Sequence, residues 1–243
     1  MVACRTSRWI RARKIESWYA ARLRKIAHFI ETWLRQYDAE RPDSNGWIVN
    51  ALRSYAETIE PWARSVGERM VSEVAARDRK TWREVSAEMG RQLHHEIDNA
   101  PIGGVIRQRL EDQVTLIKSI PLEAAQRVHN LTVENAHTGE RFTVLADKIM
   151  EGGGVSRSKA TTIARTETGR TLTEITKARS ESVNSPGYIW RTSKDFNVRP
   201  SHQAMEGRFV AWGEPPELDG MVGHAGCLPN CRCWAEPVIP DVD

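Results

Sequence analysis

Apolar residues recur every three or four positions through most of the first 150 residues, the period of an amphipathic helix. One stripe covers residues 15–37 and ends at turn-forming residues 41–47. A second stripe covers 47–59, and Pro61 then acts either as a kink or as the first-turn residue of a new helix. Further helices are predicted over 62–98, 105–119 and 122–136.

The pattern changes after residue 150. Three glycines at 152–154 predict a flexible boundary, and a serine soon after them is suited to cap a helix that ends near Ser182. Beyond that helix, short runs of β-forming residues separated by Gly, Pro and Asp predict strands in YIWRT, RFVAW and CRCWAEPVI. The predicted fold is therefore α+β. Residues 1–150 form a helical arm and bundle, and residues 151–243 form a helix with a small β-rich module.

Tryptophan is concentrated in the helical region, where six of the nine residues occur before position 83. Tryptophans at helical spacing usually belong to a core or to a seam between helices. On such long helices we expect some of them to pack against another subunit, although a monomeric bundle explains the pattern almost as well.

Charge is unevenly distributed, although the composition is ordinary for a soluble folded protein. Residues 1–36, the N-terminal arm, contain nine Lys and Arg against two Glu, whereas residues 156–243 contain eleven of each sign. The arm is predicted to contact nucleic acid or an acidic protein surface, the alternative being a solvated helix face. The candidate contact residues are Arg5, Arg8, Arg11, Arg13, Lys14, Arg22, Arg24 and Lys25.

No apolar stretch approaches the length of a membrane span, and the N-terminus lacks the apolar run of a secretory signal. We therefore expect synthesis in the cytoplasm and no membrane partner.

Three cysteines are clustered near the C-terminus. Cys227, Cys231 and Cys233 occur within seven residues, and His202 or His224 would supply a fourth ligand. In a reducing compartment such clustering favours a metal site over a disulfide, and four nitrogen and sulfur ligands suit one structural zinc ion. The alternative is that Cys233 packs as a small apolar residue and His202 makes a turn hydrogen bond. Both interpretations stay open.

Polar residues that flank the β module are predicted to form a network. Arg165 and Glu167 lie on the helix before the module, and Arg165 is expected to bind the Gly169 carbonyl or a carboxylate of the β module such as Asp195. Arg199 and His202 are candidates for the same network. We interpret it as an ion-pair network that docks the helix on the strands.

The order of motifs in this region resembles the phage Mu protein F-like family of head morphogenesis proteins. That family has a helix with I-A-R-T-E, a strand with Trp and Thr, an Asp before V-R-x-x-H, and a closing C-R-C and Pro. The matching residues are Ile163 to Glu167, Trp190 to Thr192, Asp195, Val198 to His202, Met205 to Gly207, Cys231 to Cys233 and Pro237. One departure concerns the metal site, because many relatives have a Cys where Tyr188 and Ile189 stand. Cys227 must then substitute, or the site is incomplete.

The resemblance implies a structural minor head protein rather than an enzyme. It implies a place inside the virion capsid at the portal vertex, several copies per particle, and a role in head assembly and DNA packaging or delivery. The implied partners are the portal and capsid proteins, and the arm would touch packaged double-stranded DNA. Some relatives carry toxin or transferase domains behind this region, and we expect none here because only six residues follow Pro237.

Two alternatives come from the residues themselves. A zinc-stabilised DNA-binding protein would concentrate its basic residues on the metal module, yet residues 156–243 are neutral. A metal-dependent nuclease would use His202, the cysteines and Glu206 as general base, but thiolates favour a closed zinc site over the open site that hydrolysis needs.

Overall fold

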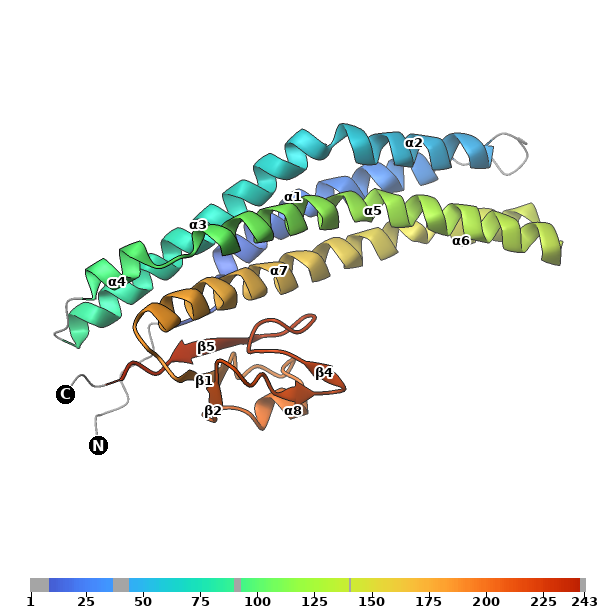
Figure 1. Cartoon of the computed structure of the whole chain (residues 1–243). Helices are drawn as coiled ribbons and strands as arrows, with labels where there is room; N and C mark the ends of the chain where they lie inside the picture. Colours follow the sequence, from blue (N-terminus) through green and yellow to red (C-terminus); the bar gives the residue numbers. More distant parts are fainter. Residues whose placement is uncertain (1–8, 37–43, 90–92, 140, 241–243) are drawn as a thin grey trace. The chain divides into compact units, whose positions relative to one another are not determined.

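The computed structural model describes residues 9–36, 44–89, 93–139 and 141–240, and it confirms the α+β class (Figure 1). The helical elements are α1 (Arg13–Leu34), α2 (Ser44–Thr58), α3 (Glu60–Glu88), α4 (His94–Asn99), α5 (Gly103–Thr138), α6 (Phe142–Met150), α7 (Gly152–Ser182) and α8 (Pro200–Gln203). The strands are β1 (Gly187–Thr192), β2 (Phe209–Ala211), β3 (Glu217–Leu218), β4 (Met221–Val222) and β5 (Cys233–Pro237). Within the described residues, no helix is both long enough and apolar enough to cross a membrane.

The chain forms two compact units, each assembled from separate stretches. Unit 1 comprises Met1–Glu16, Arg69–Arg109 and Arg165–Asp243, and unit 2 comprises Ser17–Glu68 and Leu110–Ala164. The four long helices α1, α3, α5 and α7 each contribute residues to both units. The units therefore group the chain in space, whereas the sequence analysis divided it at residue 150.

Unit 2 is helical, and its core draws on the predicted apolar stripes, although Phe29 and Trp47 of these stripes are about half exposed. Leu23, Ile30 and Leu52 are fully buried, and Tyr19 Oη donates a buried hydrogen bond of 2.9 Å to Gln113 Oε1. Pro61 lies in the first turn of α3, which was one of its two predicted roles. A proline there costs no hydrogen bond, because the first-turn amides have no partner within the helix.

Two predicted boundaries in this region are wrong. Helices 105–119 and 122–136 are one helix, α5, with Pro121 inside it. Proline removes one backbone hydrogen bond, but Pro121 is buried beside the buried Ile117 and Ile120, so packing offsets that loss. Conversely, the predicted helix 62–98 is two helices, since α3 ends at Glu88 and α4 begins at His94.

The glycine stretch at 152–154 is also helical rather than loose, since α7 begins at Gly152. A Cβ added to Gly153 would lie 3.0 Å from Cγ of Glu31, and one added to Gly152 would lie 3.2 Å from Cδ1 of Leu34. Gly152 and Gly153 therefore let α7 approach α1 closely. From the sequence alone, the same glycines indicate a flexible segment.

Unit 1 contains the β module, in which β1, β2 and β5 match the predicted runs and β3 and β4 were not predicted. The main sheet is antiparallel with strand order β2-β1-β5, and β3 and β4 form a separate hairpin. A buried cluster including Tyr188, Trp190, Val210 and Trp212 fills the module. A second cluster, centred on Trp9, Trp82 and Ile97, packs the helical part of the unit.

An enclosed ion pair joins α3 to α7 within unit 1. Arg179 Nη1 lies 2.5 Å from Asp78 Oδ2, and Thr176 Oγ1 donates to Asp78 Oδ1 at 2.6 Å. Burial raises the pKa of Asp78 to about 6, against the opposing effects of Arg179 and Thr176. The pair therefore exists at a desolvation cost that its partners only partly offset.

Candidate metal centre

Three of the predicted metal ligands meet in the core of the β module. His202, Cys231 and Cys233 are 1%, 5% and 3% exposed, and their ligand atoms all lie within 4.8 Å of one another. His202 Nδ1 faces both sulfurs, at 3.4 Å from Cys231 Sγ and 3.5 Å from Cys233 Sγ. The cluster therefore joins residues about 30 positions apart in sequence.

Local structure explains why these side chains converge. Pro200 occupies the first turn of α8 and fixes the entry of the short helix that carries His202. Cys233 is the first residue of β5 and Cys231 lies two positions before it, so in an extended chain their side chains share one face. Arg232 faces the other way, and its Nη1 lies 2.8 Å from Asp195 Oδ2.

One aromatic ring and one carboxylate lie next to the His202 imidazole. The Trp190 ring meets His202 edge-on, with ring centroids 5.7 Å apart. His202 Nε2 is buried without a hydrogen bond, and Asp219 Oδ2 lies 3.9 Å from it. Asp219 is held in turn by Ser201, whose Oγ donates to Oδ2 at 2.9 Å, and by Arg199 Nε at 3.7 Å.

A hydrogen bond between Cys231 and Cys233 shifts the pKa values of the two thiols in opposite directions. Hydrogen bonds from Cys233 and His202 lower the pKa of Cys231, against the effect of burial. The hydrogen bond with Cys231, together with burial, raises the pKa of Cys233. One thiolate of the pair is thus stabilised by its neighbours.

Cys227 and His224, the other two predicted ligands, are not part of this group. Burial and the charge of Glu174 raise the pKa of Cys227 to about 12. His224 Nδ1 lies 3.2 Å from Tyr188 Oη, and its ring also contacts Trp212. Burial lowers the pKa of His224. Sequence spacing alone did not separate these two residues from the three that converge.

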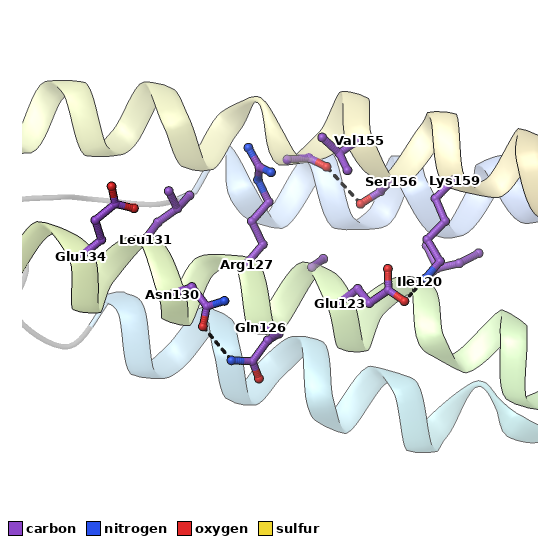
Figure 2. Close-up of a pocket in the computed structure, with 12 residues that line it drawn as sticks. Ile120, Glu123, Gln126, Arg127, Asn130, Leu131, Glu134, Val155, Ser156 and Lys159 are labelled. Carbon is purple, nitrogen blue, oxygen red and sulfur yellow. Dashed lines mark hydrogen bonds and ion pairs between the residues drawn. The ribbon is translucent and has the colours of Figure 1, made fainter. Parts of the chain in front are cut away.

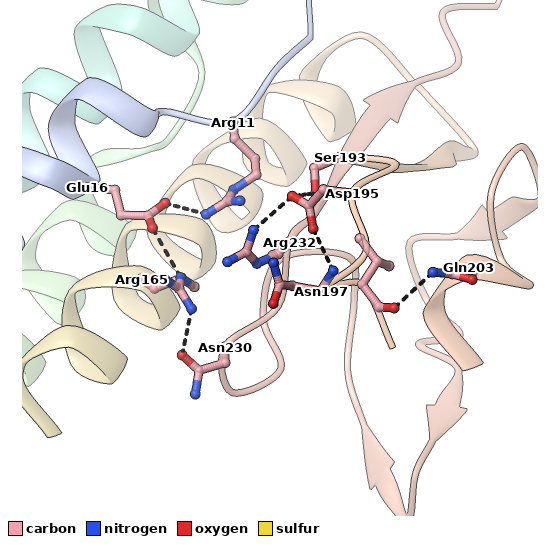
Figure 3. Close-up of polar contacts among 10 residues, drawn as sticks. Arg11, Glu16, Arg165, Ser193, Asp195, Asn197, Gln203, Asn230 and Arg232 are labelled. Atoms are coloured by element: carbon pink, nitrogen blue, oxygen red, sulfur yellow. Dashed lines mark hydrogen bonds and ion pairs between the residues drawn. The ribbon is translucent and has the colours of Figure 1, made fainter. Parts of the chain in front are cut away.

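The predicted polar network is divided into separate contacts (Figure 3). Arg165 binds Glu16 Oε1 at 3.2 Å and Asn230 Oδ1 at 3.3 Å rather than Asp195. Asp195 instead accepts hydrogen bonds from Arg232, Ser193 Oγ and the Asn197 amide. The predicted Arg165–Asp195 pair is therefore wrong, because Arg232 occupies the carboxylate.

The other two members of the predicted network have their own partners. Glu167 is buried and lies 3.1 Å from Arg170 Nη1 and 3.8 Å from Arg109 Nη1. Arg199 Nη2 donates to the Pro229 carbonyl at 2.8 Å. Arg199 and His202 do share a group, as expected, because both face Asp219.

The basic residues of the N-terminal arm differ in solvent exposure and in their contacts. Arg5 and Arg8 lie outside the described residues. Arg11 pairs with Glu16, and Arg22 lies over the Trp18 ring at 5.5 Å. Four are exposed, namely Arg13, Lys14, Arg24 and Lys25.

Sequence reasoning missed Asp219, the carboxylate nearest to His202 Nε2. A signal for its position was present, since Asp219-Gly220 is a turn-forming pair, and both residues have positive φ, of 54° and 74°, between β3 and β4. Its approach to His202 depends on the tertiary fold.

A concavity of about 450 Å³ lies in unit 2 between α5 and α7 (Figure 2). Several of its polar side chains are already engaged: Lys159 pairs with Glu123, Gln126 donates to Asn130 Oδ1 at 2.8 Å, and Ser156 donates to a backbone carbonyl. This arrangement offers less reactive chemistry than the His-Cys-Cys cluster.

Comparison with known proteins supports the resemblance seen in the sequence. The family model described as Phage Mu protein F like protein matches residues 126–236. A Haemophilus influenzae protein described as an uncharacterized protein is 25% identical over 244 aligned residues, which cover 94% of this chain and 54% of that protein. No solved structure matches significantly.

A second relative is named NAD(+)--arginine ADP-ribosyltransferase EFV, from Enterococcus faecalis. It is 29% identical over 155 residues, which cover 59% of this chain and 31% of that protein. The chain thus spans about half of the first relative and about a third of the second. The family match covers the end of α5, α6, α7 and the β module with its three clustered ligands. Over residues 126–236 the chain is therefore similar to the Phage Mu protein F like family.

Proposed function

We propose that this protein is a structural minor head protein, placed inside the capsid at the portal vertex, that supports head assembly and DNA packaging or delivery. The observation that carries this proposal is the family match over residues 126–236. Portal and capsid proteins are its proposed partners, and several copies act together in each virion.

The exposed apolar residues of unit 2 support a role in subunit contact. Large hydrophobic side chains that are 39–51% exposed occur on five of its helices: Phe29, Trp47, Leu122, Val133, Val144, Met150 and Val155. Single exposed apolar residues are normal on protein surfaces. Several of them on amphipathic helices suit association through helix faces.

Glu206, the general base of the nuclease alternative, is engaged in ways that favour a structural role. Its Oε2 accepts hydrogen bonds from the Thr192 amide at 2.6 Å and from Thr192 Oγ1 at 2.8 Å. Burial raises the pKa of Glu206, but Thr192 and the charges of Lys194 and Arg191 outweigh it and leave the pKa lowered. A carboxylate with a lowered pKa and two donors is a weak general base.

The transferase activity in the name of the Enterococcus faecalis relative is not proposed for this chain. The alignment covers 31% of that protein, and shared fold segments do not carry activity with them.

The test is co-sedimentation of the full chain with purified portal rings from the same phage, at low and high salt. Binding that survives high salt is expected, because contacts between apolar helix faces are little screened, unlike surface charges. Trp47→Ser combined with Phe29→Ser should weaken binding, whereas Phe196→Ser, which alters a 93% exposed residue of unit 1, serves as the matched control.

Two other outcomes of the co-sedimentation experiment would change the proposal. Binding that is lost at high salt would indicate contact through the charges of the N-terminal arm rather than through apolar helix faces. Absence of binding at both salts would contradict the portal proposal.

A further inference from the structure

We propose that His202 Nδ1, Cys231 Sγ and Cys233 Sγ bind one zinc ion, and that Asp219 positions the imidazole through Nε2. Cys227 and His224 take no part in the site. This inference does not depend on the role proposed for the protein in the phage head.

The distances fit a tetrahedral centre. With Zn–S bonds of about 2.3 Å and Zn–N bonds of about 2.0–2.1 Å, tetrahedral angles place nitrogen and sulfur about 3.6 Å apart. The His202 Nδ1 to sulfur distances are 3.4 and 3.5 Å. The side chains therefore already lie at the spacing that a shared metal would impose.

The chemical type of the three ligand atoms favours zinc over metals that prefer oxygen. Two thiolates and one imidazole match zinc, whereas Mg²⁺ and Ca²⁺ prefer oxygen ligands. All three side chains are buried, and a polar group buried without adequate partners is costly. A bound ion would satisfy both sulfurs and the imidazole nitrogen together.

Asp219 fits the role of an outer partner to the histidine. Histidine ligands generally donate their second ring N–H to a carboxylate, carbonyl or water, which fixes the tautomer. His202 Nε2 is buried without a hydrogen bond, and Asp219 Oδ2 is 3.9 Å away, so a small movement would form that bond. The contacts of Ser201 and Arg199 with Asp219 keep its carboxylate on this side of the module.

The fourth coordination position falls to a water molecule or another small donor. Among the described residues, the group of ligand atoms consists of these three alone. Trp190 covers the histidine, and the cysteines belong to the buried cluster of the module. Three protein ligands are one fewer than the four of most structural zinc sites. We nevertheless assign the ion a stabilising role, because all three ligands are buried among core side chains.

The first measurement is the metal content of the full chain purified under reducing conditions. We expect about one zinc per chain in the native protein, and its loss in His202→Ala, Cys231→Ser and Cys233→Ser. Cys227→Ser and His224→Ala are the matched controls, because they change the same residue types in the same module and should retain the ion.

The second measurement guards against variants that simply fail to fold. Removing metal from the native protein with a chelator should lower its melting temperature, and adding zinc should restore it. Cobalt in place of zinc should show the charge-transfer absorption of two thiolate ligands. Asp219→Asn should keep the ion but weaken its affinity by about 10–100-fold in chelator competition.

Three results would overturn the proposal. The first is native protein that neither contains zinc nor binds it when it is added. The second is loss of zinc in Cys227→Ser, which would place Cys227 in the ligand set. The third is a disulfide between Cys231 and Cys233 in freshly purified protein, seen by mass spectrometry as the loss of two hydrogens.

Discussion

At the residue scale, the enclosed pair of Asp78 and Arg179 has the most severe consequences if one partner is removed. Both side chains are at most 3% exposed, and Thr176 completes the contacts of the carboxylate. Removing one member of such a pair leaves the other charged and buried, which costs more than the pair itself contributes.

Asp78→Ala is therefore expected to lower the free energy of unfolding by about 3–5 kcal/mol. Urea unfolding followed by circular dichroism measures the change. Glu73→Gln, which breaks the exposed Arg69–Glu73 pair on the same helix, should cost less than about 1 kcal/mol. Equal losses in the two variants would show that Arg179 finds another partner.

Glu206 links the stability of the β module to pH. Its folded pKa is lowered relative to the usual value of 4.5, so the unfolded chain binds the proton more readily than the folded one. The stabilisation from Glu206 is therefore fully present above about pH 4.5 and is lost as the pH falls through the lowered folded value.

We expect Glu206→Gln to cost about 1–2 kcal/mol at pH 7, between the scale of a neutral hydrogen bond and that of a hydrogen bond to a charged group. The variant should also lose less stability than the native protein between pH 5 and 3. Urea midpoints across this range provide the measurement, with Glu214→Gln as an exposed control in the same module. Parallel pH profiles for native and variant proteins would contradict this account.

The candidate ligands also show what residue patterns do and do not predict. The C-R-C spacing correctly brings two thiols to one face, because side chains alternate along an extended chain. Whether Cys227 or His224 joins them depends on the loop between β4 and β5, whose path no periodicity encodes. Asp219 was missed because the approach of the β3–β4 turn to His202 depends on the tertiary fold.

At the element scale, α7 holds the loop before β5 through several short contacts. Thr173 Oγ1 donates to the Ala225 carbonyl at 2.6 Å, and the Asn230 amide donates to Thr166 Oγ1 at 3.0 Å. A Cβ on Gly169 would lie 2.7 Å from the Gly226 carbonyl oxygen. This helix and loop therefore meet backbone to backbone at Gly169.

Gly169→Ala is expected to destabilise the protein by about 1–3 kcal/mol, because the added methyl must displace the loop backbone. Gly154→Ala is the matched control on the same helix, where an added Cβ has nothing within 4 Å. It should raise stability by up to about 1 kcal/mol through helix propensity. Melting temperatures of the two variants should shift in opposite directions, and a shared direction would refute the close-contact argument.

Element types were largely predictable, and most errors came from tertiary packing. The apolar periodicity predicted most of the long helical stretches but not α6 or α8, and the β-forming runs predicted β1, β2 and β5. Pro121 and the glycines at 152–154 were misassigned because burial and close helix approach override local breaker signals. The two-residue strands β3 and β4 are too short for any alternation to predict.

At the scale of the whole molecule, the two compact units could not have been predicted from the order of motifs. Unit 1 collects three stretches of chain, and Trp9 from the first stretch packs edge-on against Trp82 from the second, with ring centroids 5.0 Å apart. Composition and charge change near residue 150, but contacts follow the long helices instead. The family match over residues 126–236 likewise draws on both units.

This interleaving has a consequence for how the protein is made and how it evolves. During translation, neither unit can close when its first stretch emerges from the ribosome, because each awaits residues encoded far downstream. Recombination between phage genomes at residue 150 would separate Arg69–Arg109 from the β module that shares their unit. A break at residue 150 would therefore leave both units incomplete.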